Sequence, residues 1–155
     1  MRKLVVLMGF VLAAMVAAGL FGVVHDQISY TVSPEYYTRF KFLQFRVQCG
    51  ALPYRFCVAQ VGWMATWWMG LLLGLLTGLP ALFYRTARSM LRHLWFSLFL
   101  AMAVALLCAL AGLAYGWWQT RNGVDMSQYA GWFVPQGLRD LRRFICVGYM
   151  HNAAY

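Results

Sequence analysis

The sequence predicts an all-α integral membrane protein with three transmembrane helices, and two observations carry this prediction. The first is composition: 63% of the 155 residues are hydrophobic and 11% are charged, whereas an ordinary soluble domain has about 25% charged residues. The second is the presence of three uncharged stretches, 4–24, 58–84 and 94–118. Each exceeds the roughly 20 residues with which a helix crosses a membrane core while satisfying its own backbone polar groups.

The three stretches indicate a single membrane domain, 1–155, in which segments 25–57 and 119–155 lie outside the spans. The first stretch is longer than the roughly 7–15 apolar residues of a signal peptide, so we expect it to be an uncleaved anchor. Short cationic segments near span ends face the cytoplasm. This rule places the N terminus and the 85–93 loop in the cytoplasm, although the total number of cations would favour the reverse.

Small residues recur at four-residue intervals in the second span, which places them along one helix face. The clearest set is Gly70, Gly74 and Gly78. Such a stripe lets two helix backbones approach closely. Two interpretations stay open: packing among the helices of this chain, or docking of a second copy or another membrane protein.

The segment after the first span is rich in aromatic residues and contains a helix-start signal at 33–35, a serine followed by proline and glutamate. From there an apolar stripe at helical spacing predicts a short amphipathic helix that lies on the membrane or on the other spans, with the chain before it, 28–32, extended. The stripe consists of Tyr36, Phe40, Leu43 and Val47.

The tail predicts a second amphipathic helix after Pro135, with Arg139, Arg142 and Arg143 on its basic side. A helix of this kind can lie beside anionic lipid headgroups. The net charge of +9 therefore indicates membrane lipids as partners, and the sequence contains no nucleic-acid recognition motif. The final stretch, 144–155, is apolar but too short to cross, so it either lies at the interface or begins a truncated fourth span.

Cys49 and Cys57 enclose a turn-rich stretch just before the second span. If this face is extracytoplasmic, the oxidising compartment permits a disulfide between them. If the orientation is inverted, two free thiols are expected.

Candidate chemistry is confined to polar residues on one predicted membrane face, namely His25, Asp26, Glu35 and His151. Two imidazoles and two carboxylates are suitable ligands for a transition metal such as Zn, Fe or Mn. They could also serve as catalytic groups that transfer protons, or contact a haem or quinone. The plainest alternative is that they mark helix ends at a polar interface, and no cofactor follows from the sequence with certainty.

The same residues carry a resemblance. The runs His25-Asp26-Gln27-Ile28, Glu35-Tyr36-Tyr37-Thr38 and His151-x-x-Ala154-Tyr155 resemble a pattern in uncharacterised small bacterial inner-membrane proteins. The resemblance covers about twenty residues and brings no known activity. It implies a multi-pass protein of the bacterial inner membrane with four spans.

Two functional hypotheses follow from the sequence. The first is a non-enzymatic packing or accessory component of a membrane complex, which binds itself or another membrane protein. The second is a membrane-embedded metal- or cofactor-binding enzyme that uses His25, Asp26, Glu35 and His151. Transport is a weaker hypothesis, because the predicted spans contain no charged residue of the kind that marks a transport pathway.

Overall fold

The computed structural model describes residues 2–154, and the regular structure in that range is helical throughout. The all-α fold class is therefore confirmed. The elements in chain order are α1 (Arg2–Val32), α2 (Pro34–Tyr36), the π-helix η1 (Tyr37–Lys41), α3 (Phe42–Gln44), α4 (Tyr54–Ala81), α5 (Ala87–Gln119), the 3-10 helix η2 (Met126–Tyr129) and α6 (Leu141–Ala154). Within the described range, α1, α4 and α5 are long and apolar enough to cross a membrane.

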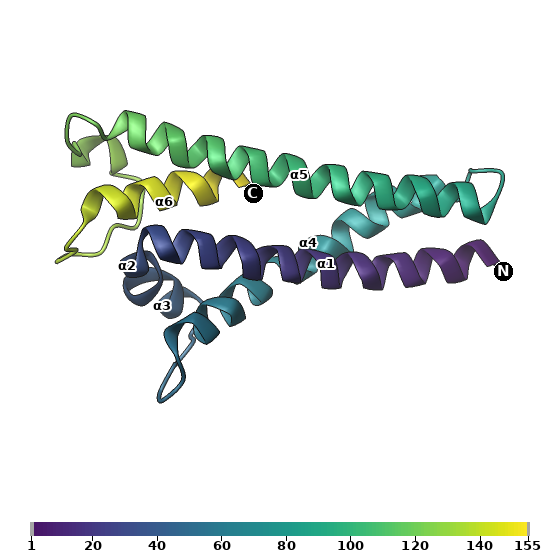
Figure 1. The fold of residues 1–155 in the computed structure, drawn as a ribbon, viewed down its shortest axis with the longest axis horizontal. Helices are drawn as coiled ribbons and strands as arrows, with labels where there is room; N and C mark the ends of the chain where they lie inside the picture. Colours follow the sequence, from purple (N-terminus) through teal and green to yellow (C-terminus); the bar gives the residue numbers. More distant parts are fainter. Residues whose placement is uncertain (1, 155) are drawn as a thin grey trace.

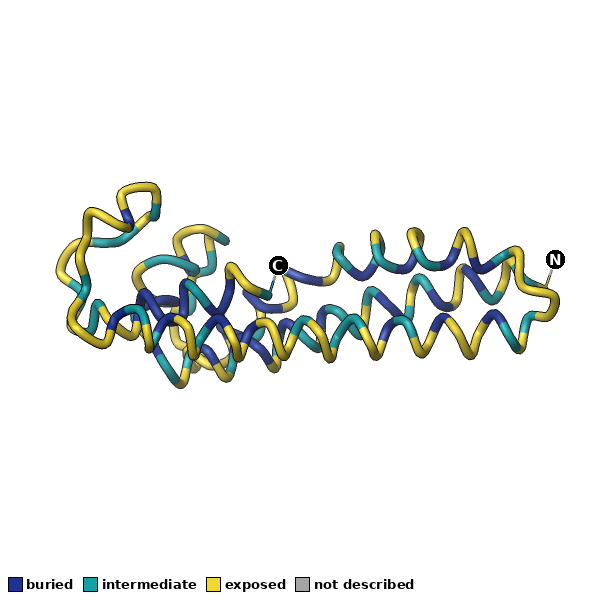
Figure 2. Tube along the Cα trace, turned by 90° about the horizontal axis from the view of Figure 1, so that it is seen from above, coloured by how far each residue is buried: buried dark blue, intermediate teal, exposed yellow. Residues whose placement is uncertain are grey.

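Helices α1 and α5 run along the long axis of the molecule, α4 crosses α1 obliquely, and the short elements gather at one end (Figure 1). The N terminus and the α4–α5 connection lie at the opposite end. Helix α6 returns between α5 and α1 and ends near the middle of the molecule. We call the end formed by residues 33–53 and 120–140 the capped end. Buried residues are concentrated in the half of the molecule that contains α6 (Figure 2).

Helix α1 continues well beyond its apolar stretch. Its 31 residues correspond to about 46 Å at a rise of about 1.5 Å per residue, against a hydrocarbon core of about 30 Å. The prediction of an extended chain over 28–32 is therefore wrong, because these residues form the last turns of α1. The end of an apolar stretch shows where a helix leaves lipid but not where the helix itself ends.

The glycine stripe of α4 packs against α1. A Cβ atom at Gly70 would overlap the backbone of Ala14 and Met15, and one at Gly78 would overlap the Leu7 side chain. Gly74 is also close, since its Cβ would lie 3.1 Å from the Cα atom of Val11. These contacts favour the interpretation in which the stripe serves packing within this chain.

The segment after α1 is helical, but its buried face differs from the predicted stripe. Tyr37 and Phe42 are buried, whereas Leu43 is 69% exposed. The π-helical turn η1 lies between α2 and α3 and contains more residues per turn than an α-helix. This shifts the register after Tyr36, so the 3.6-residue spacing used for the prediction no longer describes which side chains share a face.

Helix α6 begins at Leu141, later than the predicted start after Pro135. The Asp140 carboxylate, just before this helix, accepts a hydrogen bond from the Arg143 N–H at 2.9 Å. Residues 144–148 of α6 are all buried. This face packs closely on α5, because Cβ atoms at Gly112 and Gly116 would overlap the α6 backbone at Tyr149 and Cys146.

The connection that enters α4 is closed by a disulfide between Cys49 and Cys57. It ties the turns that follow α3 to the first turn of α4, where Cys57 is buried. Of the two alternatives that the sequence left open, a disulfide or two free thiols, the structure contains the disulfide.

We expect Gly70→Ala to destabilise the fold by about 1–3 kcal/mol, because the added methyl group forces α1 and α4 apart. Thermal unfolding of the purified protein in detergent measures this change. Gly9→Ala is the matched control, since a Cβ at Gly9 in α1 meets nothing within 4 Å. Unchanged stability together with a smaller oligomer in Gly70→Ala would instead place the stripe between chains.

Candidate metal centre

The last turns of α1 carry a group of buried polar side chains. His25 and Asp26 are each 1% exposed, and Ser29 is fully buried. His25 and Ser29 are four residues apart and therefore share a helix face. Because α1 remains helical here, these side chains project from a rigid element instead of a loop.

His151 approaches this group from α6. Its ring lies edge-on to the His25 ring, with centroids 4.7 Å apart. Its Nε2 atom lies 4.0 Å from Oδ1 of Asp26, and Nδ1 of His25 lies 3.1 Å from the same oxygen. The structure thus brings together three of the four sequence-predicted candidates, from helices that are more than a hundred residues apart in the sequence.

Two hydroxyl groups that the sequence did not single out complete the cluster. Nε2 of His151 lies 3.2 Å from the Ser29 hydroxyl and 3.4 Å from the Tyr37 hydroxyl. These hydroxyls are also hydrogen-bonded to each other. The spacing of Ser29 from His25 along α1 was a usable signal for Ser29. Tyr37 had none beyond its place in the Glu35-Tyr36-Tyr37-Thr38 run, because the π-helical turn that orients it has no clear sequence mark.

The surroundings of His151 favour its neutral form. Burial lowers the pKa of His151 well below its ordinary value, and the nearby charges of His25 and Lys41 lower it further. The Tyr36 ring stacks on the imidazole at 4.9 Å, and burial raises the pKa of this tyrosine, with a smaller effect from Asp26. A neutral imidazole is the form that binds metals.

Glu35 does not join the cluster. Its carboxylate accepts hydrogen bonds from the backbone N–H groups of Arg139 and Asp140, at 3.0 to 3.1 Å. Glu35 therefore ties α2 to the segment that precedes α6. These bonds fix the chain immediately before α6 begins at Leu141.

The arrangement of Asp26, His151 and Ser29 differs from a catalytic triad. In a triad the acid holds one imidazole nitrogen and the nucleophile lies on the other. Here Asp26 and Ser29 both face Nε2 of His151. The Ser29 hydroxyl also donates to the Asp26 carbonyl oxygen, so nucleophilic catalysis by Ser29 is not supported.

Metal coordination fits the cluster better. One ligand atom from each of His25, Asp26 and His151 lies within 4.8 Å of the others. Donors bound to one zinc ion at about 2.1 Å are about 3.4 Å apart, so coordination requires the most distant of these atoms to approach by up to about 1.4 Å. Three protein ligands with nitrogen and oxygen donors leave a further coordination position open, as in catalytic zinc sites.

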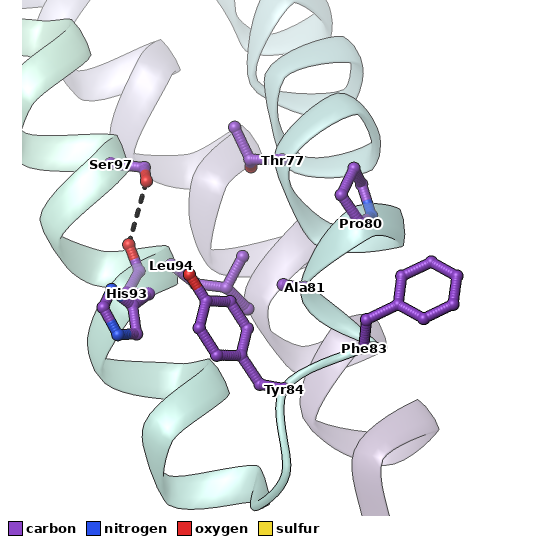
Figure 3. Close-up of a pocket in the computed structure, with 8 residues that line it drawn as sticks. All are labelled: Thr77, Pro80, Ala81, Phe83, Tyr84, His93, Leu94 and Ser97. Atoms are coloured by element: carbon purple, nitrogen blue, oxygen red, sulfur yellow. Dashed lines mark hydrogen bonds between the residues drawn. The ribbon is translucent and has the colours of Figure 1, made fainter.

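A hollow lies at the end of the molecule opposite the capped end, between α4 and α5 (Figure 3). Figure 3 shows Tyr84 beside His93, whose rings stack at 4.5 Å, and Phe83 pointing away. Among its described lining residues His93 is the one side chain that could ligate a metal. This hollow therefore lacks the convergence of donors that distinguishes the centre at His25.

No protein-family model, curated protein or solved structure matches this chain. A fold alone does not determine a function. The function is therefore inferred from the side chains that the fold brings together.

We expect Glu35→Gln to loosen the segment before α6, because a neutral amide oxygen accepts the two backbone N–H groups less strongly than a carboxylate. A loss of about 1 kcal/mol in the local stability of this segment corresponds to about fivefold faster amide exchange. Hydrogen–deuterium exchange of a peptide covering 136–143 measures it. In the control, Asp125→Asn, whose carboxylate caps its own turn at Ser127, this peptide should exchange as in the wild type; equal acceleration in both variants would contradict the anchoring role.

Proposed function

We propose that this chain is a multi-pass protein of the bacterial inner membrane that binds one divalent transition-metal ion through His25, Asp26 and His151 and uses it in catalysis. The observation that carries the proposal is the convergence of these donors from α1 and α6 at a buried point. Glu35, the fourth candidate from the sequence, supports this centre from outside.

Burial favours this proposal over the simpler interpretation of polar residues at a helix end. Side chains that only mark a membrane interface extend toward water. In contrast, His25 and Asp26 are each 1% exposed and His151 is 4% exposed. Buried ionisable groups carry a large desolvation cost unless they are paired or coordinate a metal. The Asp26 carboxylate has a partner in His25, 3.1 Å away, and a bound cation would offset more of that cost.

The residues around the centre suit general metal-assisted chemistry. A metal ion with an open position can bind and activate water or polarise a substrate oxygen. The hydroxyls of Tyr37 and Ser29 lie beside His151 and are placed to hydrogen-bond a group bound there. The mixed nitrogen and oxygen donors suit Zn, Mn or Fe.

The orientation of the chain in the membrane follows from the short cationic segments near its span ends. With the N terminus and the 85–93 loop in the cytoplasm, the centre and the Cys49–Cys57 disulfide lie on the extracytoplasmic side. A disulfide is compatible with that oxidising compartment. We therefore place the chemistry at the outer surface of the inner membrane.

An accessory role in a membrane complex is the second candidate, and α5 favours it. Only 17% of the most apolar window of α5 is buried, against 33% for that of α4. Ala101 and Ala105 of α5 line an apolar hollow of about 200 Å³. A helix of a second protein could cover these small residues.

The metal proposal predicts about one ion per purified wild-type chain. His25→Ala and His151→Ala should each abolish stoichiometric metal, because each removes one of three ligands. Tyr37→Phe should keep the ion with about 10- to 100-fold weaker affinity, since it alters only the surroundings of a ligand. Inductively coupled plasma mass spectrometry of the detergent-purified protein, with zinc, manganese or iron supplied, measures this.

His93→Ala is the matched control, because His93 lies at the opposite end beside Tyr84 and its loss should leave the metal content unchanged. Circular dichroism and gel filtration should show that each variant is folded. A folded wild-type protein that binds none of these metals would refute the metal centre and leave the accessory role as the favoured function.

The orientation predicts that a membrane-impermeant maleimide labels Cys49 and Cys57 in intact cells only after reduction of their disulfide. Mass spectrometry of the labelled peptides measures this. Cys146, buried beside Thr120, should stay unlabelled in both cases. Labelling of Cys49 and Cys57 that requires permeabilised cells would reverse the orientation.

A further inference from the structure

A cleft of about 580 Å³ lies beside His151 at the capped end. The helical segment 36–44 forms one side of it, and residues 131–133 with α6 form the other. It is distinct from the metal ligands except for His151, which lines the cleft and also belongs to the buried cluster. Through His151, the cleft borders the buried cluster.

Aromatic rings form the walls of this cleft. The ring centroids of Phe40 and Phe133, which both line the cleft, lie 5.4 Å apart. The ring centroid of Tyr36 lies 5.1 Å from that of Phe144 and 4.9 Å from that of His151. Such walls suit a ligand with an apolar body.

The cationic group in the cleft is Lys41. Its Nζ atom lies 5.2 Å from the Phe40 ring centroid and 5.7 Å from that of Tyr36. It donates a hydrogen bond to the Gln44 side chain at 3.1 Å, and within residues 2–154 no carboxylate lies within 4.0 Å of it. Burial lowers the pKa of Lys41, an effect that the negative charge of Asp26 partly offsets. An ammonium group that has lost part of its hydration in this way attracts an anion more strongly than one in bulk water.

We propose that this cleft binds an anionic phospholipid, with Lys41 as the counter-charge for its phosphate group and the aromatic rings of Tyr36, Phe40, Phe133 and Phe144 around its apolar part. The chemistry of the cleft combines one cation with aromatic rings and with further polar side chains, Gln44 and Asn152. A free phosphate ion would use the cation but gain nothing from the rings.

The position of the cleft supports a lipid as the occupant. It lies at the capped end (Figure 1), where α1 and α5 end and α4 begins, so phosphate groups of the surrounding bilayer are at hand.

This inference rests on the proposed metal centre, because it names the class of substrate that the centre meets. The phosphate group beside Lys41 would lie on the side of His151 that faces the cleft, next to the metal-binding group. Phospholipid binding itself depends on the cleft, and it can therefore be measured separately from metal content.

The test uses the full chain, purified in a non-ionic detergent and titrated by calorimetry with dihexanoyl phosphatidic acid. Dihexanoyl phosphatidylcholine and inorganic phosphate are the comparison ligands. We expect phosphatidic acid to bind at least about tenfold more tightly than either, because only it offers both the negative charge and the apolar body. Lys41→Gln should weaken its binding by about tenfold or more, while Lys41→Arg should retain it.

Arg39→Gln is the matched control, since Arg39 is an exposed cation two residues away that does not line the cleft. It should bind phosphatidic acid as the wild type does. Equal binding by Lys41→Gln and wild type, equal weakening in Arg39→Gln, or phosphate binding as tight as that of phosphatidic acid would each overturn the inference. Metal content measured on the wild-type samples distinguishes the proposals: a metal-loaded wild-type protein that binds no phosphatidic acid refutes the cleft, whereas a wild-type protein that binds phosphatidic acid but no metal refutes the centre.

Discussion

Because α1 stays helical from its apolar stretch through Val32, His25, Asp26 and Ser29 are carried on a rigid rod and share a well-defined direction. A loop at this point would let water reach the carboxylate and would leave the side chains free to disperse. The continued helix instead presents them to α6, which covers them. The geometry of the polar cluster depends on this one continuity of backbone.

The covering elements are held by polar contacts of their own. Glu35 accepts two backbone N–H groups before α6, and the π-helical turn directs Tyr37 inward beside Ser29. Around them, Tyr36 and Phe144 form an aromatic shell with His151. The buried polar cluster is thus enclosed by apolar rings and fixed by hydrogen bonds at its edges. This arrangement produces the desolvation that lowers the pKa of His151.

Sequence reasoning located the long helices well, because an uncharged stretch of sufficient length leaves little choice of structure in lipid. It was less successful wherever a tertiary contact decided the outcome. The π-turn moved Tyr37 and Phe42 to the buried face in place of Leu43, and nothing in the local spacing announces such a turn. The sequence also grouped Glu35 with the histidines, because it shows residue types but not which carboxylate meets a backbone amide far along the chain.

The close packing of glycines has a mechanical consequence. Gly70 brings α4 close to α1, and Gly112 with Gly116 brings α6 close to α5. His25 and Asp26 belong to the first pair of helices and His151 to the second, so an ion bound by all three would cross-link the two pairs.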